Sequence, residues 1–250
     1  MTRVVAAETL DGLREDDPAA IRSRRDLQRV HRAMGTRAIV LRALRDWPTL
    51  LHTGAPLRIL ELGAGDGSLM LGVARALEDA WPPVELTLLD RQNLVEHATI
   101  ERYAAVGWTA TPHIVDVLDW IASAEDAPRE GVPRTSWDLI VANLFLHHFE
   151  VKQLATLLAS IASQTRCFFA CEPRRAWLPL AGSYLIGAIG ANAVTREDAV
   201  LSVHAGFRDD ELTALWPRES NGWKLTEYSA GLFSHCFRAE RLDAVRERTH

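Results

Sequence analysis

The hydrophobic pattern from about residue 57 onward repeats one unit, a continuous apolar run followed by apolar residues at helical spacing. In the first unit Leu57, Ile59 and Leu60 form the run, and Leu69 and Val73 lie four residues apart in the next stretch. Five such runs span about residues 57–61, 84–90, 109–115, 137–143 and 166–172. Apolar strands that alternate with helices predict a parallel sheet covered on both faces. Ligands of such sheets bind at the carboxyl ends of the strands.

The remaining segments depart from this repeat. Residues 1–20 are polar and mixed in charge, which predicts a loose arm that frays or folds back. Apolar residues at steps of three and four predict one or two cap helices over residues 21–47. After residue 172 the alternation stops, and a lid insertion is expected at about 174–207, followed by a hairpin around Gly231. We therefore expect an arm and helical cap over residues 1–52 and one α/β domain over residues 53–250.

The turn after the first strand is the strongest candidate for a ligand site. Glu61 ends that strand, and Gly63, Gly65 and Gly67 follow before the first helix. Glycine permits positive φ and close approach of a ligand, and a helix N-terminus offers free N–H groups. Asp90 ends the next strand 23 residues after Gly67. This is close to the spacing of about 20 at which an acid binds ribose hydroxyls in nucleotide-binding turns.

Two other interpretations of this turn compete. A dinucleotide-binding dehydrogenase has the fingerprint G-x-G-x-x-G, whereas this chain reads G-A-G-D-G and continues with Ser68, Leu69 and Met70. An acid at a strand end can also merely cap the following helix. The positions of Glu61 and Asp90 on either side of three glycines favour a nucleotide-type cofactor over both alternatives.

Five stretches together resemble class I S-adenosylmethionine-dependent methyltransferases, namely ELGAGDG, TLLD, HIVDV, WDLIVAN and LFLHHF. The likeness covers about residues 57–241. The LHHF stretch is similar to the branch that methylates small molecules, including polyketide and phenolic-lipid intermediates. The resemblance implies a Rossmann-like, doubly wound α/β sheet of seven mostly parallel strands with an antiparallel last strand. It also implies S-adenosyl-L-methionine as cofactor and S-adenosyl-L-homocysteine as product.

The resemblance further implies which residues bind the methyl donor. In this sequence they are Glu61, Gly63, Ala64, Gly65, Asp66, Asp90, Arg91, Asp116, Val117, Asn143 and Leu144. Asp116 is expected to accept a hydrogen bond from the adenine amino group, with the backbone of Val117 at a ring nitrogen. For Asp116 a helix-capping role is an equal alternative.

Two adjacent histidines follow the fourth strand, at the edge where a transferred methyl group would emerge. A hydroxyl acceptor must lose a proton, and histidine is the obvious base, so His147 and His148 are the candidate catalytic residues. Adjacent side chains usually face different ways, so one is expected to act, and the resemblance favours His148. A capping or structural role is the alternative. No metal is predicted, because the ends of strands four and five offer no three-acid set suited to magnesium.

Composition and charge limit the kinds of binding partner that we expect. The 250 residues carry a formal net charge of −5, without the broad basic surface that binding to bulk nucleic acid needs. No stretch is apolar enough for a signal peptide or a membrane span, which predicts a cytoplasmic protein without a membrane partner. The three cysteines are expected to be reduced core thiols. A monomer and a homodimer remain equally open.

The sequence therefore predicts a methyltransferase of secondary metabolism that acts on a small aromatic or polyketide-derived molecule. Transfer to oxygen is favoured over carbon or nitrogen. The expected lid supplies an apolar lining or, alternatively, core packing, from Trp177, Leu178, Leu180, Tyr184, Leu185 and Ile186. Two alternatives stay open, a methyltransferase of tRNA or protein and a catalytically silent module that binds S-adenosylmethionine.

Overall fold

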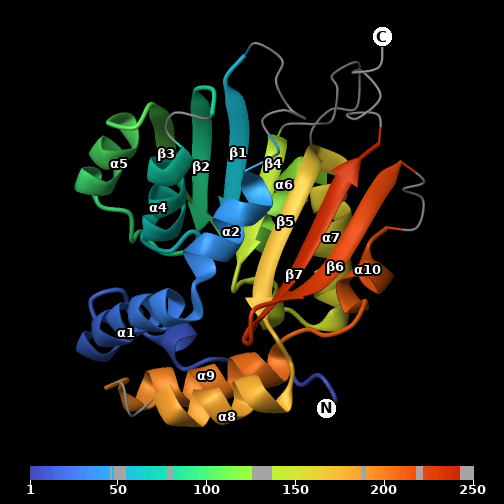
Figure 1. The fold of residues 1–250 in the computed structure, drawn as a ribbon. Coiled ribbons are helices and arrows are strands. Elements are labelled where there is room, and N and C mark those ends of the chain that lie inside the picture. The colour runs from blue at the N-terminus through green and yellow to red at the C-terminus, as the bar shows by residue number, and fades with distance from the viewer. Residues whose placement is uncertain are drawn as a thin grey trace.

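A seven-stranded sheet in the order β3-β2-β1-β4-β5-β7-β6 forms the centre of the protein (Figure 1). The computed structural model describes residues 1–45, 47, 55–77, 81–125, 137–186, 190–217 and 222–242. The strands are β1 (Leu57–Leu62), β2 (Val84–Asp90), β3 (Trp108–Ile114), β4 (Trp137–Asn143), β5 (Thr165–Pro173), β6 (Trp223–Ala230) and β7 (Ser234–Arg241). β1 to β5 are parallel, and β7 runs antiparallel to β5 and β6. The predicted fold class is confirmed.

Helices cover both faces of the sheet and enclose two hydrophobic cores. One core contains α2 (Thr36–Leu44), α4 (Ser68–Leu77) and α5 (His97–Ala104). The other contains α6 (Val117–Glu125), α7 (Val151–Gln164) and α10 (Glu211–Leu215). Successive side chains of a strand point to opposite faces, so Ile59 packs in the first core and Leu60 in the second. This two-sided burial is why the central strands β1, β4 and β5 are mainly apolar, whereas β3 and β6 at the two edges of the sheet are more exposed.

The helix after β2 begins later than the sequence pattern predicts. Apolar residues at helical spacing predict a helix over residues 91–106 with Leu94 packed inward, but in the structure α5 begins at His97. The carboxylate of Asp90 accepts a hydrogen bond from the backbone N–H of Gln92 at 2.9 Å, which turns the chain directly after the strand. Leu94 instead lines a cavity. The prediction was wrong for residues 91–96, where polar groups bond to the N-terminal segment: the backbone N–H of Asn93 donates to Glu15 Oε1 at 2.8 Å and the side chain of Gln92 donates to the carbonyl of Leu13 at 3.3 Å.

Three further helices form a layer beyond the carboxyl ends of the strands, below the sheet in Figure 1. They are α1 (Pro18–Met34), α8 (Trp177–Leu185) and α9 (Ala193–Ala205). A buried hydrogen bond of 2.6 Å between the hydroxyl groups of Ser23 and Thr195 joins α1 to α9. Segments that are 172 residues apart at this contact thus cover one edge of the sheet. The predicted domain boundary between residues 52 and 53 lies outside the described residues.

Residues 1–17, here called the N-terminal strap, run back across this layer and include the short helix η1 (Leu10–Gly12). The backbone N–H of Val4 donates to the carbonyl of His204 at 3.1 Å. The N–H groups of Thr9 and Leu10 donate to the carboxylate of Asp198 at 2.7 and 2.9 Å. The expected arm folds back and is attached to α9 by these bonds.

Two findings concern the expected absence of a membrane span and the expected reduced state of the cysteines. No described helix has both the length and the apolar character required to cross a membrane. Cys167, Cys171 and Cys236 are free and buried. The expectation of reduced core thiols is therefore met.

Gly206 connects α9 to the sheet, and the structure leaves no room for a side chain there. A Cβ atom at this position would overlap the carbonyl oxygen of Pro173, the last residue of β5. That carbonyl accepts the N–H of Phe207 at 2.9 Å, so it cannot move without breaking a hydrogen bond. We predict that Gly206→Ala lowers the free energy of unfolding, measured by urea denaturation, by about 1–3 kcal/mol. Gly222→Ala is the control, because a Cβ atom there meets nothing within 4 Å; equal losses in both variants would contradict the prediction.

Candidate active site

A cavity of about 420 Å³ lies at the carboxyl edge of the sheet, between the strand ends and the helical layer. Its walls come from the glycine turn after β1, the end of β2, the turn after β4, and residues of α1, α8, α9 and the N-terminal strap. Parallel strands bring their carboxyl ends to one edge, so residues from distant parts of the chain meet there. Most of the predicted site residues lie on these walls.

The glycine turn presents bare backbone to this cavity. Gly63, Gly65 and Gly67 have φ values of +67°, +56° and +71°, a conformation that other L-residues rarely adopt. A Cβ atom on Gly63 would overlap the ring of Phe145, whereas one on Gly65 would meet no protein atom within 4 Å. The turn therefore keeps open space beside Gly65 for a ligand. Ala64 and Asp66 also line the cavity.

Glu61 is a buried acid whose carboxylate faces the cavity. Its Oε2 atom is shielded from solvent and has no hydrogen-bond partner among the described residues. Burial, together with the nearby Asp66 and Asp90, raises the pKa of this carboxyl group well above its usual value. An unpartnered buried acceptor is costly, so the site suits a ligand that donates hydrogen bonds or carries positive charge. The ammonium group of S-adenosylmethionine has both properties.

Asp90 lies on the same wall and is held by the backbone. Its Oδ2 accepts the N–H of Gly65 at 2.8 Å, and its Oδ1 accepts the N–H of Gln92 at 2.9 Å. Each carboxylate oxygen can accept a further hydrogen bond, which fits a pair of ribose hydroxyls. Asn143, at the end of β4, also lines the cavity, and its buried Oδ1 has no partner among the described residues.

The remaining predicted donor-binding residues divide into two groups. Arg91 and Leu144 line the cavity, and Leu144 has a positive φ of 50°. Asp116 and Val117 are absent from the cavity walls. The Oδ1 of Asp116 accepts the N–H of Leu118 at 2.8 Å, which is the helix-capping arrangement that the sequence left open.

His147 is buried between two carboxylates. Its Nδ1 lies 2.8 Å from Glu172 Oε2, and its Nε2 lies 3.3 Å from Glu8 Oε1. Burial by itself lowers the pKa of His147, but the hydrogen bonds with Glu172 and Glu8 outweigh it and raise the pKa to about 9. Both ring nitrogens are engaged, so His147 offers no free lone pair in this arrangement.

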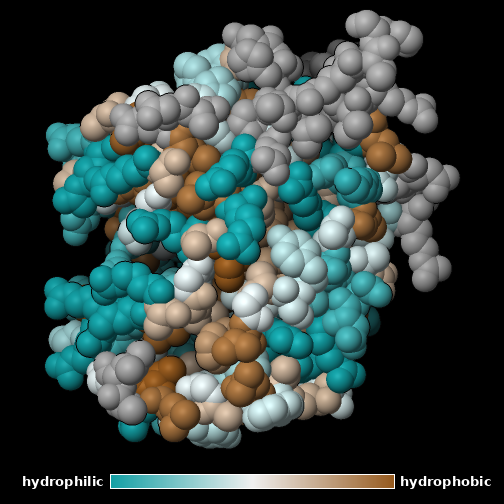
Figure 2. All heavy atoms as spheres, viewed as in Figure 1, coloured by the Kyte–Doolittle hydropathy of each residue, from teal (hydrophilic) through white to brown (hydrophobic). Residues whose placement is uncertain are grey.

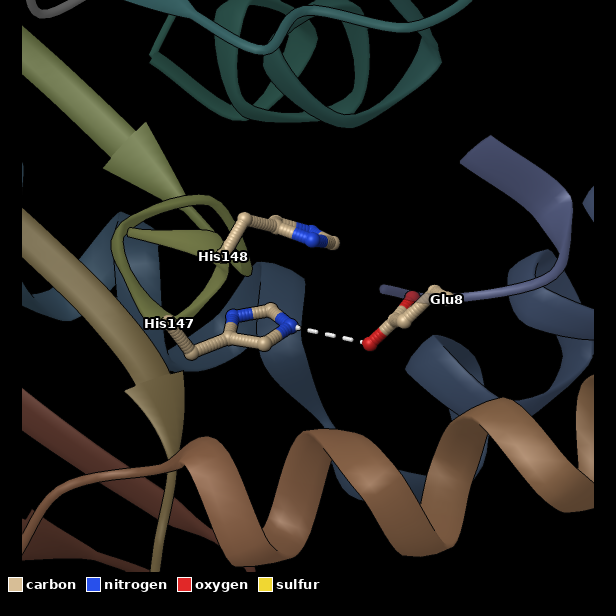
Figure 3. A group of neighbouring side chains, drawn as sticks. All are labelled: Glu8, His147 and His148. Carbon is tan, nitrogen blue, oxygen red and sulfur yellow. Dashed lines mark hydrogen bonds and ion pairs between the residues drawn. The ribbon is translucent and has the colours of Figure 1, made fainter. Parts of the chain in front are cut away.

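His148 is more accessible than its neighbour. Its side chain is 25% exposed, and its Nδ1 lies 3.2 Å from Asp11 Oδ2. The two imidazole rings lie 4.2 Å apart between centroids, and Figure 3 shows both on the side of the turn that faces Glu8. Asp11 also pairs with Arg91 at 3.1 Å, so the N-terminal strap links the histidine turn to the end of β2.

Comparison with known proteins decides the family. The model of the family described as lysine methyltransferase matches residues 39–177, more than half of the chain. The chain belongs to this methyltransferase family. The protein is thus an S-adenosylmethionine-dependent methyltransferase, and the predicted cofactor is confirmed. No curated protein matches the chain.

Solved methyltransferase structures share the fold at low sequence identity. The plantazolicin methyltransferase BpumL, in complex with a triazolic desmethylPZN analog and SAH, is 13% identical with a TM-score of 0.57. That match covers 90% of this chain and 92% of BpumL. A putative O-methyltransferase from Nostoc punctiforme PCC 73102 is 12% identical with a TM-score of 0.53, and the match covers 95% of this chain and 64% of that one.

The lid of this methyltransferase differs from the expected one. Trp177, Tyr184 and Leu185 were expected either to line the cavity or to pack in the core, but they are 75%, 66% and 69% exposed. α8 instead contacts the cavity through smaller residues such as Gly182 and Ser183, and Ile186 follows directly after it. Hydrophobic surface gathers over α8 in Figure 2, whereas α1 is covered mainly by hydrophilic residues. The sequence of α8 is apolar and rich in small residues, and this pattern does not indicate which of its side chains face the cavity.

Sequence reasoning missed four residues of the site, Glu8, Asp11, Gln28 and His31. None belongs to a motif, and the strap lacks the periodicity that would signal an ordered segment. Gln28 donates to the carboxylate of Asp66 at 2.6 Å and so joins α1 to the glycine turn. The Nε2 of His31 is shielded and has no partner among the described residues. Burial lowers the pKa of His31 to about 4, with partial compensation from Asp66.

His31 makes the stability of this methyltransferase depend on pH. Its ordinary pKa in an unfolded chain is about 6.5. The unfolded state therefore binds a proton at pH values where the folded state does not, and stability falls as the pH drops from about 6.5 to about 4. We predict that His31→Gln removes about 1–3 kcal/mol of this loss, measured by urea denaturation at several pH values. His113→Gln, exposed on β3, is the control, and an unchanged pH slope in His31→Gln would contradict the assignment.

Proposed function

We propose that this methyltransferase acts on a small aromatic or polyketide-derived acceptor in secondary metabolism, at oxygen rather than at carbon or nitrogen. The observation that carries the proposal is the covered geometry of the cavity. The glycine turn forms one wall, the histidine turn forms another, and the N-terminal strap with α8 and α9 contributes the cover. A concave, covered site with few convergent polar groups is typical of small-molecule binding.

On the donor side, the proposal assigns the residues of the first two strand ends. S-adenosylmethionine, when bound, supplies a sulfonium methyl group that a nucleophile can displace. Glu61 accepts hydrogen bonds from the ammonium group, which its unpartnered Oε2 supports. Asp90 accepts the ribose hydroxyls beside the open space at Gly65. The assignment of Asp116 and Val117 to the adenine rests on the sequence resemblance alone.

On the acceptor side, the proposal assigns the histidine pair. Methyl transfer requires the acceptor atom, the methyl carbon and the sulfur to lie in line, and a hydroxyl acceptor must also lose its proton. His147 is held at both nitrogens, while the half-buried His148 is the member with access to solvent. We infer that His148 faces the acceptor and that His147 positions it, with their ring centroids 4.2 Å apart.

A second candidate function is supported by one observation, the description of the matched family as lysine methyltransferase. A lysine side chain of a protein would then enter the cavity from outside. The strap and the cap helices favour an enclosed small molecule instead. The formal net charge of −5 disfavours tRNA as acceptor.

The donor assignment predicts a specific loss of affinity. Asp90→Ala removes two acceptors for the ribose hydroxyls and weakens S-adenosylmethionine binding by about 1–3 kcal/mol, measured by isothermal titration calorimetry. Glu85→Ala, an exposed acid near the start of the same strand, is the matched control. Thermal unfolding shows whether each variant is folded. Unchanged donor affinity in a folded Asp90→Ala protein would refute the ribose assignment.

The acceptor assignment predicts loss of turnover without loss of donor affinity. His148→Ala lowers the rate of methyl transfer by a factor of about 100 or more. The assay follows transfer from labelled S-adenosylmethionine to a panel of phenols, to metabolite extracts and to protein extracts. His113→Ala, an exposed histidine on β3, serves as control. Labelling of protein lysines alone would favour the second candidate, and intact donor binding without any transfer would favour a silent binding module.

A further inference from the structure

Three side chains in the cavity wall bring ligand-type atoms together from two distant parts of the chain. Glu8 of the N-terminal strap faces His147 and His148 of the turn after β4 (Figure 3). Each residue offers one carboxylate oxygen or ring nitrogen, and these atoms all lie within 4.8 Å of one another. All three residues line the cavity. The cluster thus combines a carboxylate with two imidazoles at a concave site.

The distances suit a small divalent ion. His147 Nε2 and Glu8 Oε1 are 3.3 Å apart. Two ligand atoms bound at about 2.0–2.1 Å in a tetrahedral arrangement are separated by about 3.3 Å. A ring nitrogen of the half-buried His148 lies within 4.8 Å of both of these ligand atoms and provides the third ligand.

The groups behind the cluster have the arrangement found around metal-binding histidines. Glu172 Oε2 lies 2.8 Å from His147 Nδ1, which leaves Nε2 as the ligand atom. Glu172 is itself held by the backbone N–H groups of Phe145 and Leu146, at 3.0 and 2.9 Å. On the other side, the hydroxyl of Ser202 donates to Glu8 Oε1. Hydrogen bonds from outside the cluster therefore orient two of the three potential ligands, His147 and Glu8.

The charged groups around the cluster also favour a cation. Three carboxylates, those of Glu8, Asp11 and Glu172, surround the two imidazoles. Arg91 pairs with Asp11, and the guanidinium of Arg3 donates to the backbone carbonyl of His147 at 3.2 Å. Binding of an ion would displace the proton of His147, after which the three carboxylates outnumber the guanidinium groups of Arg91 and Arg3, and a divalent cation would offset this negative charge.

We propose that Glu8, His147 and His148 bind a divalent transition-metal ion, for which Zn²⁺ is the best fit, with one open position toward the cavity. Two imidazoles and one carboxylate form a donor set that zinc prefers, whereas magnesium requires mainly oxygen ligands. Three protein ligands with an open fourth position are typical of zinc sites that act on a substrate.

The open position gives the ion a role in the proposed function, on which this part of the inference rests. A hydroxyl oxygen of the acceptor that binds a divalent ion loses its proton more readily. That proton leaves to solvent, the oxygen forms the new bond to the methyl carbon, and the electron pair of the methyl–sulfur bond stays on sulfur. His148 would then act on the acceptor through the ion rather than by removing the proton itself.

Metal binding can be tested without donor or acceptor. The full-length protein, free of any histidine tag and dialysed against a chelator, is titrated with Zn²⁺ and with Mg²⁺ by isothermal titration calorimetry. We expect one Zn²⁺ per chain and a weakening of its affinity by at least 10-fold in each of Glu8→Gln, His147→Asn and His148→Asn. His113→Asn is the matched histidine control and keeps the affinity of the unaltered protein.

Replacement of Zn²⁺ by Co²⁺ provides a second readout, because the visible spectrum of Co²⁺ reports tetrahedral nitrogen and oxygen ligands. Absence of stoichiometric Zn²⁺ binding, or equal affinity in the three folded variants and the control, would overturn the proposal. Preference for Mg²⁺ would overturn the choice of metal. Failure of S-adenosylmethionine to bind would instead contradict the proposed function, so the two failures are distinguishable.

Discussion

The carboxylate of Glu172 is the group on which the geometry of the site depends. It lies fully buried near the end of β5 and accepts hydrogen bonds from the backbone N–H groups of Phe145, Leu146 and His147. The same carboxylate contacts the ring of His147. A single acid thus determines both the path of the chain after β4 and the orientation of the first histidine. Buried charged groups persist only when they are satisfied in this way.

The N-terminal strap contributes the part of the cavity wall that faces the two histidines. Glu8 and Asp11 contact the two histidines, and Asp11 also contacts Arg91 at the end of β2. The strap is held in turn by Asp198 of α9, which accepts two of its backbone N–H groups. The acceptor wall of the cavity therefore depends on contacts between the strap, α9 and the turn after β4, whereas the donor wall is built mainly from the ends of β1 and β2.

Sequence patterns predict the parts of the site that depend on local structure better than the parts that depend on contacts between distant segments. The strands and the glycine turn have local signals, because two-sided burial demands apolar runs and positive φ demands glycine at Gly63, Gly65 and Gly67. Glu8, by contrast, meets His147 across 139 positions, and nothing in the sequence around residue 8 encodes that contact. The orientation of α8 was equally hidden, because Trp177 and Leu185 satisfy an apolar pattern whether they face inward or outward. The late start of α5 accompanies the hydrogen bonds of Gln92 and Asn93 with Leu13 and Glu15, long-range contacts that the apolar spacing of residues 91–106 does not indicate.

The attachment of the strap to α9 also bears on how the protein is made. A ribosome synthesises residues 1–17 well before their hydrogen-bond partners Asp198, Ser202 and His204, which follow nearly 200 residues later. The central strands β1 to β5 can pair while the strap still lacks its docking surface. The acceptor wall can therefore assemble only after α9 has been synthesised.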